Sequence, residues 1–294
     1  MTASTKTKLL NRARSALFQS TGVDRLLPMI TCGKQPSSLP GKLPPNPSQY
    51  PAPTLRSMTR NGFRYELDIS DFMEWCVYFG IVIEPREALF SLIKPGDVVI
   101  DVGANIGEVT LGASARVGRE GSVYSFEANP LVFEKLRRHI ALNGVSNVNE
   151  YNMGLSDQAA LVHFYSPEGN RGGGRVAASG DAPGGAAVNL IALDEFWTAD
   201  KIRLDLIKVD VEGHEHKVLR GAEKTLRRHH PKLFVELNDA NLRKYQSSAS
   251  ELLQFLENLG YKMSDASSGA RLTSQDEFSG RHLDFVAVAR ETAA

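Results

Sequence analysis

Predominantly apolar runs alternate with amphipathic segments from residue 86 onwards, and this alternation limits the folds that the chain can adopt. The runs at 98–100, 204–209 and 233–237 have the composition of strands that are buried on both faces. Residues 215–228 place their apolar side chains on one side of a helix, as packing against a sheet requires. The pattern predicts a mostly parallel sheet with helices on both faces, in which ligands bind at the carboxyl ends of the strands.

Hydrophobic periodicity and turn residues set the expected order of the elements. Strands are expected at 98–100, 122–126, 148–153, 204–209, 233–237, 261–263 and 284–288. Helices are expected at 86–93, 107–117, 131–142, 215–228 and 249–259. The fold class is therefore α/β, and every polar residue directly after a strand is a candidate for the binding site.

Composition and charge argue against several classes of function. The formal net charge is +0, which argues against a broad surface for nucleic acid or an acidic membrane. No apolar run approaches the roughly 20 residues that cross a bilayer, and no signal-peptide core precedes the domain, so the cytoplasm is the expected location. The two cysteines, Cys32 and Cys76, form no CxxC pair and predict neither a zinc site nor a disulfide framework. The basic runs 137–139 and 227–230 are expected on solvated helix ends.

Composition also divides the chain along its length. Residues 1–55 are interpreted as an N-terminal arm and proline-rich linker, because half of the 14 prolines fall within 36–53 and favour an extended path. Residues 56–95 form a cap segment rich in aromatic side chains, and residues 96–294 form the sheet domain. The arm could mediate a dimer, and its 5–20 stretch has the pattern of a short helix.

A glycine-rich segment at 168–187 has almost no apolar side chain to anchor it. A mobile loop is expected there, serving either as a lid or as simple disorder. Arg171 and Arg175 are the residues in it that could grip an anionic substrate.

The motif Asp101-Val-Gly-Ala-Asn-Ile-Gly107 ends a strand and opens a helix, the context in which a glycine-rich turn binds a nucleotide. Gly103 and Gly107 would let the backbone approach a ligand closely. A dinucleotide site has glycine where Asn105 and Glu108 stand, and the carboxylates of Asp101 and Glu108 would repel a pyrophosphate. The same charges suit the cationic amino-acid tail and sulfonium of S-adenosylmethionine (SAM). Asp101, Gly103, Asn105 and Gly107 are therefore predicted to bind SAM.

Polar residues also follow the next two strands. Glu127 ends the strand at 122–126, where a carboxylate can accept hydrogen bonds from both ribose hydroxyls, and Asn129 follows it. Ser156 and Asp157 follow the third strand, where a carboxylate can accept a hydrogen bond from the adenine amine. All four are predicted to bind the cofactor. The alternatives are that Glu127 caps the next helix and that Ser156-Asp157 only forms a turn.

Four titratable residues follow the fourth strand: Asp210, Glu212, His214 and Glu215. They are predicted to be catalytic, because a substrate hydroxyl must lose its proton as it attacks the methyl carbon and a histidine or carboxylate can accept that proton. Asp210 is also expected to contact the cofactor. A divalent cation held by these groups would be another route to the same deprotonation. Their spacing permits a metal without demanding it, and no metal site is predicted.

Two further polar residues, Glu236 and Asn238, end the fifth strand with both side chains expected on the pocket rim. They are predicted to bind the substrate, and structural hydrogen bonding is the alternative. His216 is expected at the surface, because it lies on a different helix face from His214.

Over about residues 63–290 these features resemble the FkbM-type family of class I SAM-dependent methyltransferases. The resemblance rests on Val99-Ile-Asp-Val-Gly-Ala-Asn-Ile-Gly107, Phe126-Glu-Ala-Asn-Pro130, Gly154-Leu-Ser-Asp157, Leu193-Asp-Glu195 and Ile207-Lys-Val-Asp-Val-Glu-Gly-His-Glu215. It implies a Rossmann-like three-layer sandwich with a seven-stranded, mostly parallel sheet whose last strand is antiparallel. It also implies methyl transfer to oxygen, typically on a sugar hydroxyl of a glycan or on a natural product.

The resemblance also implies roles for individual residues. Asp101, Gly103, Asn105, Glu127 and Asp157 would line the cofactor, and Asp210, Glu212 and Glu215 would lie near the reacting centre. The proline-rich arm and the glycine-rich segment depart from a minimal family member, so the resemblance assigns them no role.

Three other functions stay open at this point. N-methylation of nucleic acid or protein is disfavoured, because an Asn-Pro-Pro-aromatic motif is absent after the fourth strand and the chain is not basic overall. A non-catalytic SAM-binding protein would not need the titratable cluster at 210–216. A nicotinamide oxidoreductase is disfavoured by the residues that replace glycine in the motif after the first strand.

Overall fold

The computed structural model describes residues 25–82, 85–166, 169–170, 174–177, 185–198 and 203–289. They fall into two compact units. The first lies within Met1–Glu84 and Pro167–Gly173, and the second lies within Pro85–Ser166 and Gly174–Ala294. The boundaries predicted after residues 55 and 95 stay predictions.

The first unit contains a two-stranded antiparallel sheet and a helix. β1 (Leu55–Arg60) pairs with β2 (Phe63–Asp68), and α3 (Phe72–Phe79) follows. The Asp71 side chain caps α3 by accepting a hydrogen bond from the Met73 N–H at 3.2 Å. The cap removes one of the unpaired N–H groups at the start of the helix.

The extended path expected for the proline-rich linker is wrong at two places, where prolines begin the short helical turns η3 (Pro40–Lys42) and η4 (Pro47–Gln49). Another proline begins α2 (Pro28–Thr31), ahead of the proline-rich stretch. Proline fits the first position of a helical turn, because that position needs no N–H donor and the ring presets φ. The Trp75 indole donates to the Pro45 carbonyl at 2.8 Å and ties the linker to α3.

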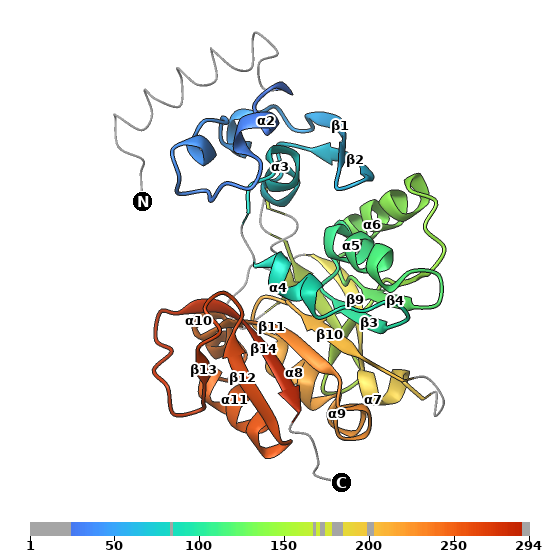
Figure 1. The fold of residues 1–294 in the computed structure, drawn as a ribbon, viewed down its shortest axis with the longest axis vertical. Coiled ribbons are helices and arrows are strands. Elements are labelled where there is room, and N and C mark those ends of the chain that lie inside the picture. The colour runs from blue at the N-terminus through green and yellow to red at the C-terminus, as the bar shows by residue number, and fades with distance from the viewer. Residues whose placement is uncertain are drawn as a thin grey trace. The chain divides into compact units, whose positions relative to one another are not determined.

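The second unit is built on an eight-stranded sheet in the order β13-β12-β14-β11-β10-β3-β4-β5 (Figure 1). Its strands are β3 (Val98–Val102), β4 (Ser122–Phe126), β5 (Val148–Tyr151), β10 (Leu206–Val209), β11 (Lys232–Asn238), β12 (Tyr261–Asp265), β13 (Arg271–Leu272) and β14 (His282–Ala289). Neighbouring strands from β5 to β11 are parallel, and β14 runs antiparallel between β11 and β12. The predicted α/β class with an antiparallel last strand is confirmed, and the two-residue β13 adds an eighth strand at the edge.

Helices cover both faces of this sheet. They are α4 (Arg86–Ser91), α5 (Glu108–Val117), α6 (Pro130–Leu142), α7 (Leu193–Phe196), α8 (Glu215–Arg220), α9 (Glu223–His229), α10 (Asp239–Lys244) and α11 (Ala249–Asn258). One buried core includes side chains of α8, α9 and α11, and the other includes side chains of α4 and α5. Ile100 enters the first core and Val99 the second. β3 is buried on both faces for this reason, and its sequence is a continuous apolar run.

Two predicted elements are interrupted by contacts that are distant in the sequence. The strand expected at 148–153 ends at Tyr151, because β6 pairs with β9 instead of continuing the main sheet. A separate four-stranded sheet results, in the order β6-β9-β7-β8, with β6 (Gly154–Ser156), β7 (Ala160–Tyr165), β8 (Arg175–Val176) and β9 (Ala186–Ala192). The helix expected at 215–228 is divided into α8 and α9 around Gly221, where a Cβ atom would lie 1.9 Å from the Ser156 carbonyl oxygen.

The glycine-rich segment 168–187 is described in part. Its residues in β8 and at the start of β9 are paired strands, so the expectation of one continuous loop is wrong there. Residues 168, 171–173 and 178–184 of this segment, Arg171 among them, lie outside the described residues, as does the helix expected at 5–20. Within the described ranges, no helix combines the length and the apolarity that a bilayer crossing requires.

Candidate functional site

The glycine-rich loop after β3 is fixed to the strands on either side of it. The N–H groups of Gly103 and Ala104 both donate to the Phe126 carbonyl at the end of β4, at 3.0 Å each. On the β10 side, a Cβ atom at Gly103 would lie 1.9 Å from the Asp210 carbonyl oxygen. Gly103 has a φ of +79°, which glycine adopts without strain. The loop backbone therefore occupies the carboxyl edge of the sheet, where ligands of doubly wound folds bind.

The Glu127 carboxylate holds this loop from the end of β4. Its Oε2 accepts a hydrogen bond from the Asn105 N–H at 2.9 Å, and its Oε1 accepts one from the Asn129 N–H at 2.8 Å. Burial raises the pKa of Glu127 to about 7, although these two N–H groups and the charge of Lys208 oppose the rise. Each carboxylate oxygen has a second lone pair. Glu127 can therefore hold the loop and still accept hydrogen bonds from the hydroxyls of a ligand.

A buried ion pair lies beneath the loop. Asp101 is 0% exposed, and its Oδ1 lies 3.4 Å from Lys208 Nζ. Lys208 also donates to the Gly103 carbonyl at 2.9 Å, and its Nζ lies 3.5 Å from Asp210 Oδ2. The second oxygen of Asp101 accepts from the Thr110 hydroxyl at 2.7 Å. Asp101 thus supports the loop through Lys208, and its direct contact with a cofactor stays a prediction.

Substitution of Lys208 by methionine should lower the free energy of unfolding by about 3–5 kcal/mol, because it leaves the buried Asp101 carboxylate without its counter-charge. Urea unfolding followed by circular dichroism measures this change. The double variant Lys208→Met/Asp101→Asn should recover much of the loss, since it removes both charges. Lys262→Met, at an exposed position of β12, is the matched control. Equal losses of unfolding free energy in Lys208→Met and Lys262→Met would show that the ion pair has no special role.

β6 and the residue before α8 are joined by their side chains. Ser156 Oγ lies 2.9 Å from His214 Nε2, and the Ser156 hydroxyl donates to Asp157 Oδ1 at 3.1 Å. Because the Ser156 hydroxyl hydrogen is donated to Asp157, His214 carries its own proton on Nε2 and donates it to Ser156 Oγ. The Nδ1 atom of His214 is then left as an acceptor. Burial, followed by the charge of Lys217, lowers the pKa of His214 to about 4. The imidazole is therefore neutral at pH 7.

The turn between β10 and α8 is shaped by Glu215. Its Oε1 accepts hydrogen bonds from the Val211 N–H at 3.1 Å and the Gly213 N–H at 2.9 Å, and the residue is 0% exposed. Between them Glu212 adopts the left-handed conformation, with φ 56°. The Glu212 carboxylate accepts a hydrogen bond from Asn241 Nδ2 at 3.0 Å and remains partly exposed. Glu215 therefore orients the turn, and Glu212 is presented at its surface.

Four carboxyl groups interact electrostatically at this edge of the sheet: Asp210, Glu212, Glu215 and Glu236. Burial, followed by the charge of Asp210, raises the pKa of Glu212 and raises that of Glu236 well above its ordinary value. Burial also raises the pKa of Glu215 to about 7. The Asp210 side chain is 27% exposed, whereas Glu215 and Glu236 are buried. Glu212, Glu215 and Glu236 therefore keep protons at pH values where exposed carboxyl groups are ionised.

The stability of a Glu215→Gln variant relative to the wild type should depend on pH. The pKa of Glu215 is about 7 in the folded state against an ordinary 4.5, so its contribution is fully present below pH 4.5 and is lost as the pH rises through about 7. Glutamine keeps an oxygen for the Val211 and Gly213 N–H groups. The difference in unfolding free energy should therefore move in the variant's favour by up to about 1.4 kcal/mol per pH unit between these values. Urea unfolding at pH 5 and pH 8 measures this difference, which would stay constant if Glu215 were ionised throughout.

The residues predicted to bind the substrate have structural partners. Glu236 Oε1 lies 2.7 Å from Nε2 of His282 in β14, while Oε2 of Glu236 has no hydrogen-bond partner among the described residues. The Asn238 side chain caps α10 by accepting from the Asn241 N–H at 3.2 Å. The substrate roles of Glu236 and Asn238 stay predictions. Sequence reasoning missed His282, which belongs to no motif and meets Glu236 only through strand pairing.

β8 borders the same edge from the second sheet. Burial raises the pKa of Glu212, and the nearby charge of Arg175 opposes this rise. The Tyr245 hydroxyl donates to the Val176 carbonyl, and the Tyr245 ring packs edge-on against His214 with centroids 5.1 Å apart. These contacts connect β8 to the turn after β10. Arg175, predicted from the sequence to grip an anionic substrate, therefore lies within electrostatic reach of that turn.

Two histidines differ from the sequence expectations. His139, expected on a solvated basic surface, is 0% exposed, and its Nδ1 lies 2.8 Å from the Ile106 carbonyl in the glycine-rich loop. A signal for this position existed, because His139 follows Leu136 by three residues and so shares the apolar side of α6. His216, expected at the surface, is partly buried, with Nδ1 2.5 Å from Ser247 Oγ, and burial lowers its pKa.

Parallel pairing brings the ends of β3, β4 and β10 to one edge, and with them the loop, Glu127 and the turn after β10. Capping of α6 belongs to Asn129, whose side chain accepts from the Leu131 N–H at 3.1 Å, and not to Glu127. In the part of the chain that the structure describes, no three His, Cys, Asp or Glu side chains are arranged to hold a metal ion.

A family model described as the methyltransferase FkbM domain matches residues 101–263, which span the loop, Glu127 and the turn after β10. The chain belongs to the FkbM methyltransferase family. The family resemblance seen in the sequence motifs is thereby confirmed, and the matched residues include most of the eight-stranded sheet.

Two curated relatives of this FkbM-family chain are named as methyltransferases. Hexuronic acid methyltransferase AglP of Haloferax volcanii is 31% identical over 140 residues, which are 47% of this chain and 55% of the relative. Methyltransferase sdnD of Sordaria araneosa is 30% identical, with 42% of this chain and 60% of the relative covered. The chain therefore aligns with little more than half the length of these curated relatives.

Solved structures match this chain at low TM-scores and low sequence identity. The methyltransferase FkbM from Methylobacillus flagellatus KT has a TM-score of 0.41 and 18% identity, covering 73% of this chain and 54% of that one. M. jannaschii TYW2 in complex with AdoMet has a TM-score of 0.43 and 16% identity, covering 81% of this chain and 87% of that one.

Proposed function

We propose that this FkbM-family chain transfers a methyl group from SAM to a hydroxyl group. The geometry of Glu127 carries the proposal. Its carboxylate stands at the carboxyl end of β4, binds the backbone of the glycine-rich loop after β3 and retains lone pairs toward a ligand. A carboxylate at this point of a doubly wound sheet is placed to bind the hydroxyls of a ribose.

The residues present fit SAM. Glu127 would accept hydrogen bonds from the ribose hydroxyls and Asp157 one from the adenine amine, while Gly103 lets the loop backbone come close to the amino-acid portion. The partly exposed Asp210 offers a carboxylate to the cationic amino group. When bound, SAM supplies a methyl group that its sulfonium makes electrophilic.

The turn after β10 supplies candidates for removing the hydroxyl proton. Asp210 and Glu212 have partly exposed carboxylates, so either can accept a proton from an acceptor hydroxyl that docks at this edge. Glu215 and His214 are buried, and in this proposal they position the turn, Glu215 through the Val211 and Gly213 N–H groups and His214 through Ser156.

The acceptor in this proposal is a sugar hydroxyl, on an acidic sugar in particular. The name of one relative, a hexuronic acid methyltransferase, supports this class of acceptor. So does Arg175, whose charge acts on Glu212 at the same edge of the sheet. A guanidinium beside the docking point would pair with the carboxylate of a uronic acid through charge-assisted hydrogen bonds.

A panel of acceptors tests the function and its substrate class. Methyl transfer from SAM should be faster to glycosides of uronic acids than to the matching neutral sugars, and mass spectrometry of the products measures it. Arg175→Gln should raise KM for the uronic acid about tenfold and leave KM for the neutral sugar unchanged, because one charged pair is lost. Arg137→Gln, on the exposed side of α6, is the control.

The outcomes separate the two parts of the proposal. Equal rates on acidic and neutral sugars that Arg175→Gln leaves unchanged would contradict the acidic-sugar acceptor. Failure of the protein to bind SAM by calorimetry would contradict the methyltransferase activity itself.

A further inference from the structure

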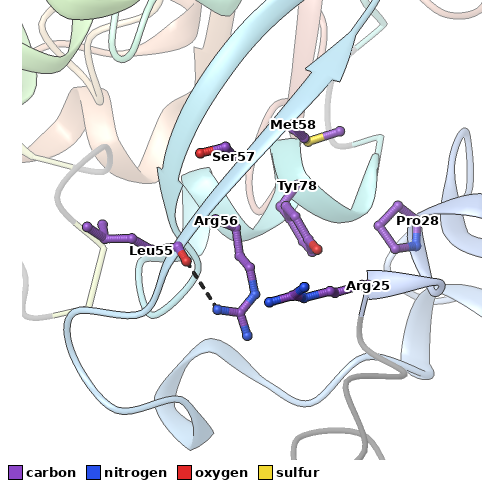
Figure 2. A pocket seen from close by; sticks show the side chains of 7 residues that line it. All are labelled: Arg25, Pro28, Leu55, Arg56, Ser57, Met58 and Tyr78. Carbon is purple, nitrogen blue, oxygen red and sulfur yellow. Dashed lines mark hydrogen bonds between the residues drawn. The ribbon is translucent and has the colours of Figure 1, made fainter.

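The first unit contains a cavity of its own, of about 450 Å³. The cavity is lined by Arg25, Pro28, Leu55, Arg56, Ser57, Met58 and Tyr78. Figure 2 shows the guanidinium groups of Arg25 and Arg56 and the hydroxyl of Tyr78 directed into the same space. Arg25 lies three residues before α2, Arg56 lies in β1 and Tyr78 lies in α3, so three separate segments contribute to the cavity.

Two of the half-buried side chains of β1, Arg56 and Met58, line this cavity. Arg56, Met58 and Arg60 share the half-buried side of the strand. Arg56 donates from Nη1 to the Leu55 carbonyl at 3.1 Å, which holds its guanidinium beside the start of β1. Arg60 donates from Nη2 to the Tyr78 carbonyl at 3.1 Å and fixes the end of α3 against the strand. A hydrogen bond from Arg60 therefore joins β1 to α3 beside the cavity.

The described lining carries two positive charges and no carboxylate. An anion between two guanidinium groups is attracted to both of them. A guanidinium presents its N–H donors in a planar fork that matches two oxygens of a phosphate. Tyr78 is 5% exposed, and its hydroxyl adds a donor that lies away from solvent. Together these groups complement a tetrahedral oxyanion.

We propose that this cavity binds the phosphate group of a phosphate ester. Its surroundings bear on what the ester carries. Large apolar side chains stand exposed on α2, beside it and at the rim: Leu26 is 59% exposed, Met29 83%, Ile30 53% and Leu55 68%. A phosphate site surrounded by exposed apolar side chains suits a lipid headgroup, whose hydrocarbon would cover them. A soluble phosphate ester would use the same donors without covering the apolar residues.

The test uses the full chain and probes of both kinds. Cosedimentation measures binding to phosphatidylcholine vesicles with and without phosphatidic acid, and titration calorimetry measures binding of inorganic phosphate and glycerol phosphate. Binding to a phosphate probe should weaken about tenfold or more in Arg25→Gln and in Arg56→Gln. Arg56→Lys should keep part of the binding, because lysine retains the charge and loses the fork. Lys42→Gln removes an exposed charge outside the cavity and should change nothing.

The outcomes distinguish the sources of phosphate. Binding to acidic vesicles alone, weakened by Met29→Ser, supports the site and identifies a lipid headgroup. Binding to the soluble phosphates, unchanged in Met29→Ser, supports the site and identifies a soluble ester. Absence of phosphate-dependent binding, or equal weakening by Lys42→Gln, overturns the proposal. Thermal unfolding checks each variant, and if Arg56→Gln fails to fold, the exposed Arg25 decides the test through Arg25→Gln.

Discussion

Replacement of Glu127 by alanine is expected to weaken SAM binding by roughly 100-fold or more. The loss has two sources. Hydrogen bonds from the ribose hydroxyls to a charged acceptor disappear, and each such bond contributes about 1.5–3 kcal/mol. The loop also loses the acceptor for the Asn105 N–H, so its backbone is no longer held at the docking edge. Titration calorimetry with SAM measures the dissociation constant.

Glutamine at position 127 should weaken binding almost as much as alanine. Both carboxylate oxygens accept backbone N–H groups, from Asn105 and from Asn129, and an amide offers only one oxygen. One N–H would therefore face an NH₂ group. Glu134→Ala, whose side chain is 67% exposed on α6, is the control and should bind SAM normally. Unchanged affinity in Glu127→Ala would remove this carboxylate from the cofactor site.

Alanine at position 103 is expected to abolish SAM binding and to destabilise the second unit. At the positive φ of Gly103, a residue with a side chain has a conformational energy about 1–2 kcal/mol higher than glycine. Its Cβ would also lie 1.9 Å from the Asp210 carbonyl oxygen, and a backbone atom cannot rotate out of the way. The loop must then shift away from β10, which adds roughly 1–3 kcal/mol of strain. Urea unfolding and calorimetry measure the two effects.

Gly260→Ala separates steric contact from backbone conformation. Gly260 has a similar φ of +84°, but a Cβ atom there would have no neighbour within 4 Å. Its alanine variant should lose only the conformational part of the stability and should bind SAM normally. Equal destabilisation of the two variants would mean that contact with Asp210 costs nothing, and the close approach of the loop to β10 would then have no energetic consequence.

The parts of the fold that the sequence predicts are those set by local pattern. β3 is a continuous apolar run because all five of its residues are buried, and the glycines that follow it mark the loop without any knowledge of distant contacts. Parallel pairing then brings Glu127 beside the loop, so the position of this carboxylate was also predictable.

The parts that the sequence does not predict depend on partners far along the chain. β6 leaves the main sheet because it pairs with β9, more than thirty residues later, and no local signal marks the break after Tyr151. The same holds for Lys208, which forms its ion pair with Asp101 only once β3 and β10 are neighbours. Distance along the chain, rather than residue type, sets this limit.

The candidate site shows the same division. The sequence places Glu215 among the catalytic residues by its spacing, but spacing does not say whether a carboxylate faces solvent or its own turn. His139 was expected in solvent because two arginines precede it, whereas burial against Ile106 follows from which side of α6 faces the loop.

The place of β14 in the sheet bears on how the protein folds during synthesis. β14 lies between β11 and β12, so both of these strands are made before the strand that joins them. Until residues 282–289 leave the ribosome, β11 exposes an unpaired edge, and β12 has no place in the sheet. Such edges attract other chains. A nascent chain stalled before this strand should therefore depend on chaperones, and shortening β14 should reduce the yield of soluble protein more than loss of a surface helix of equal length.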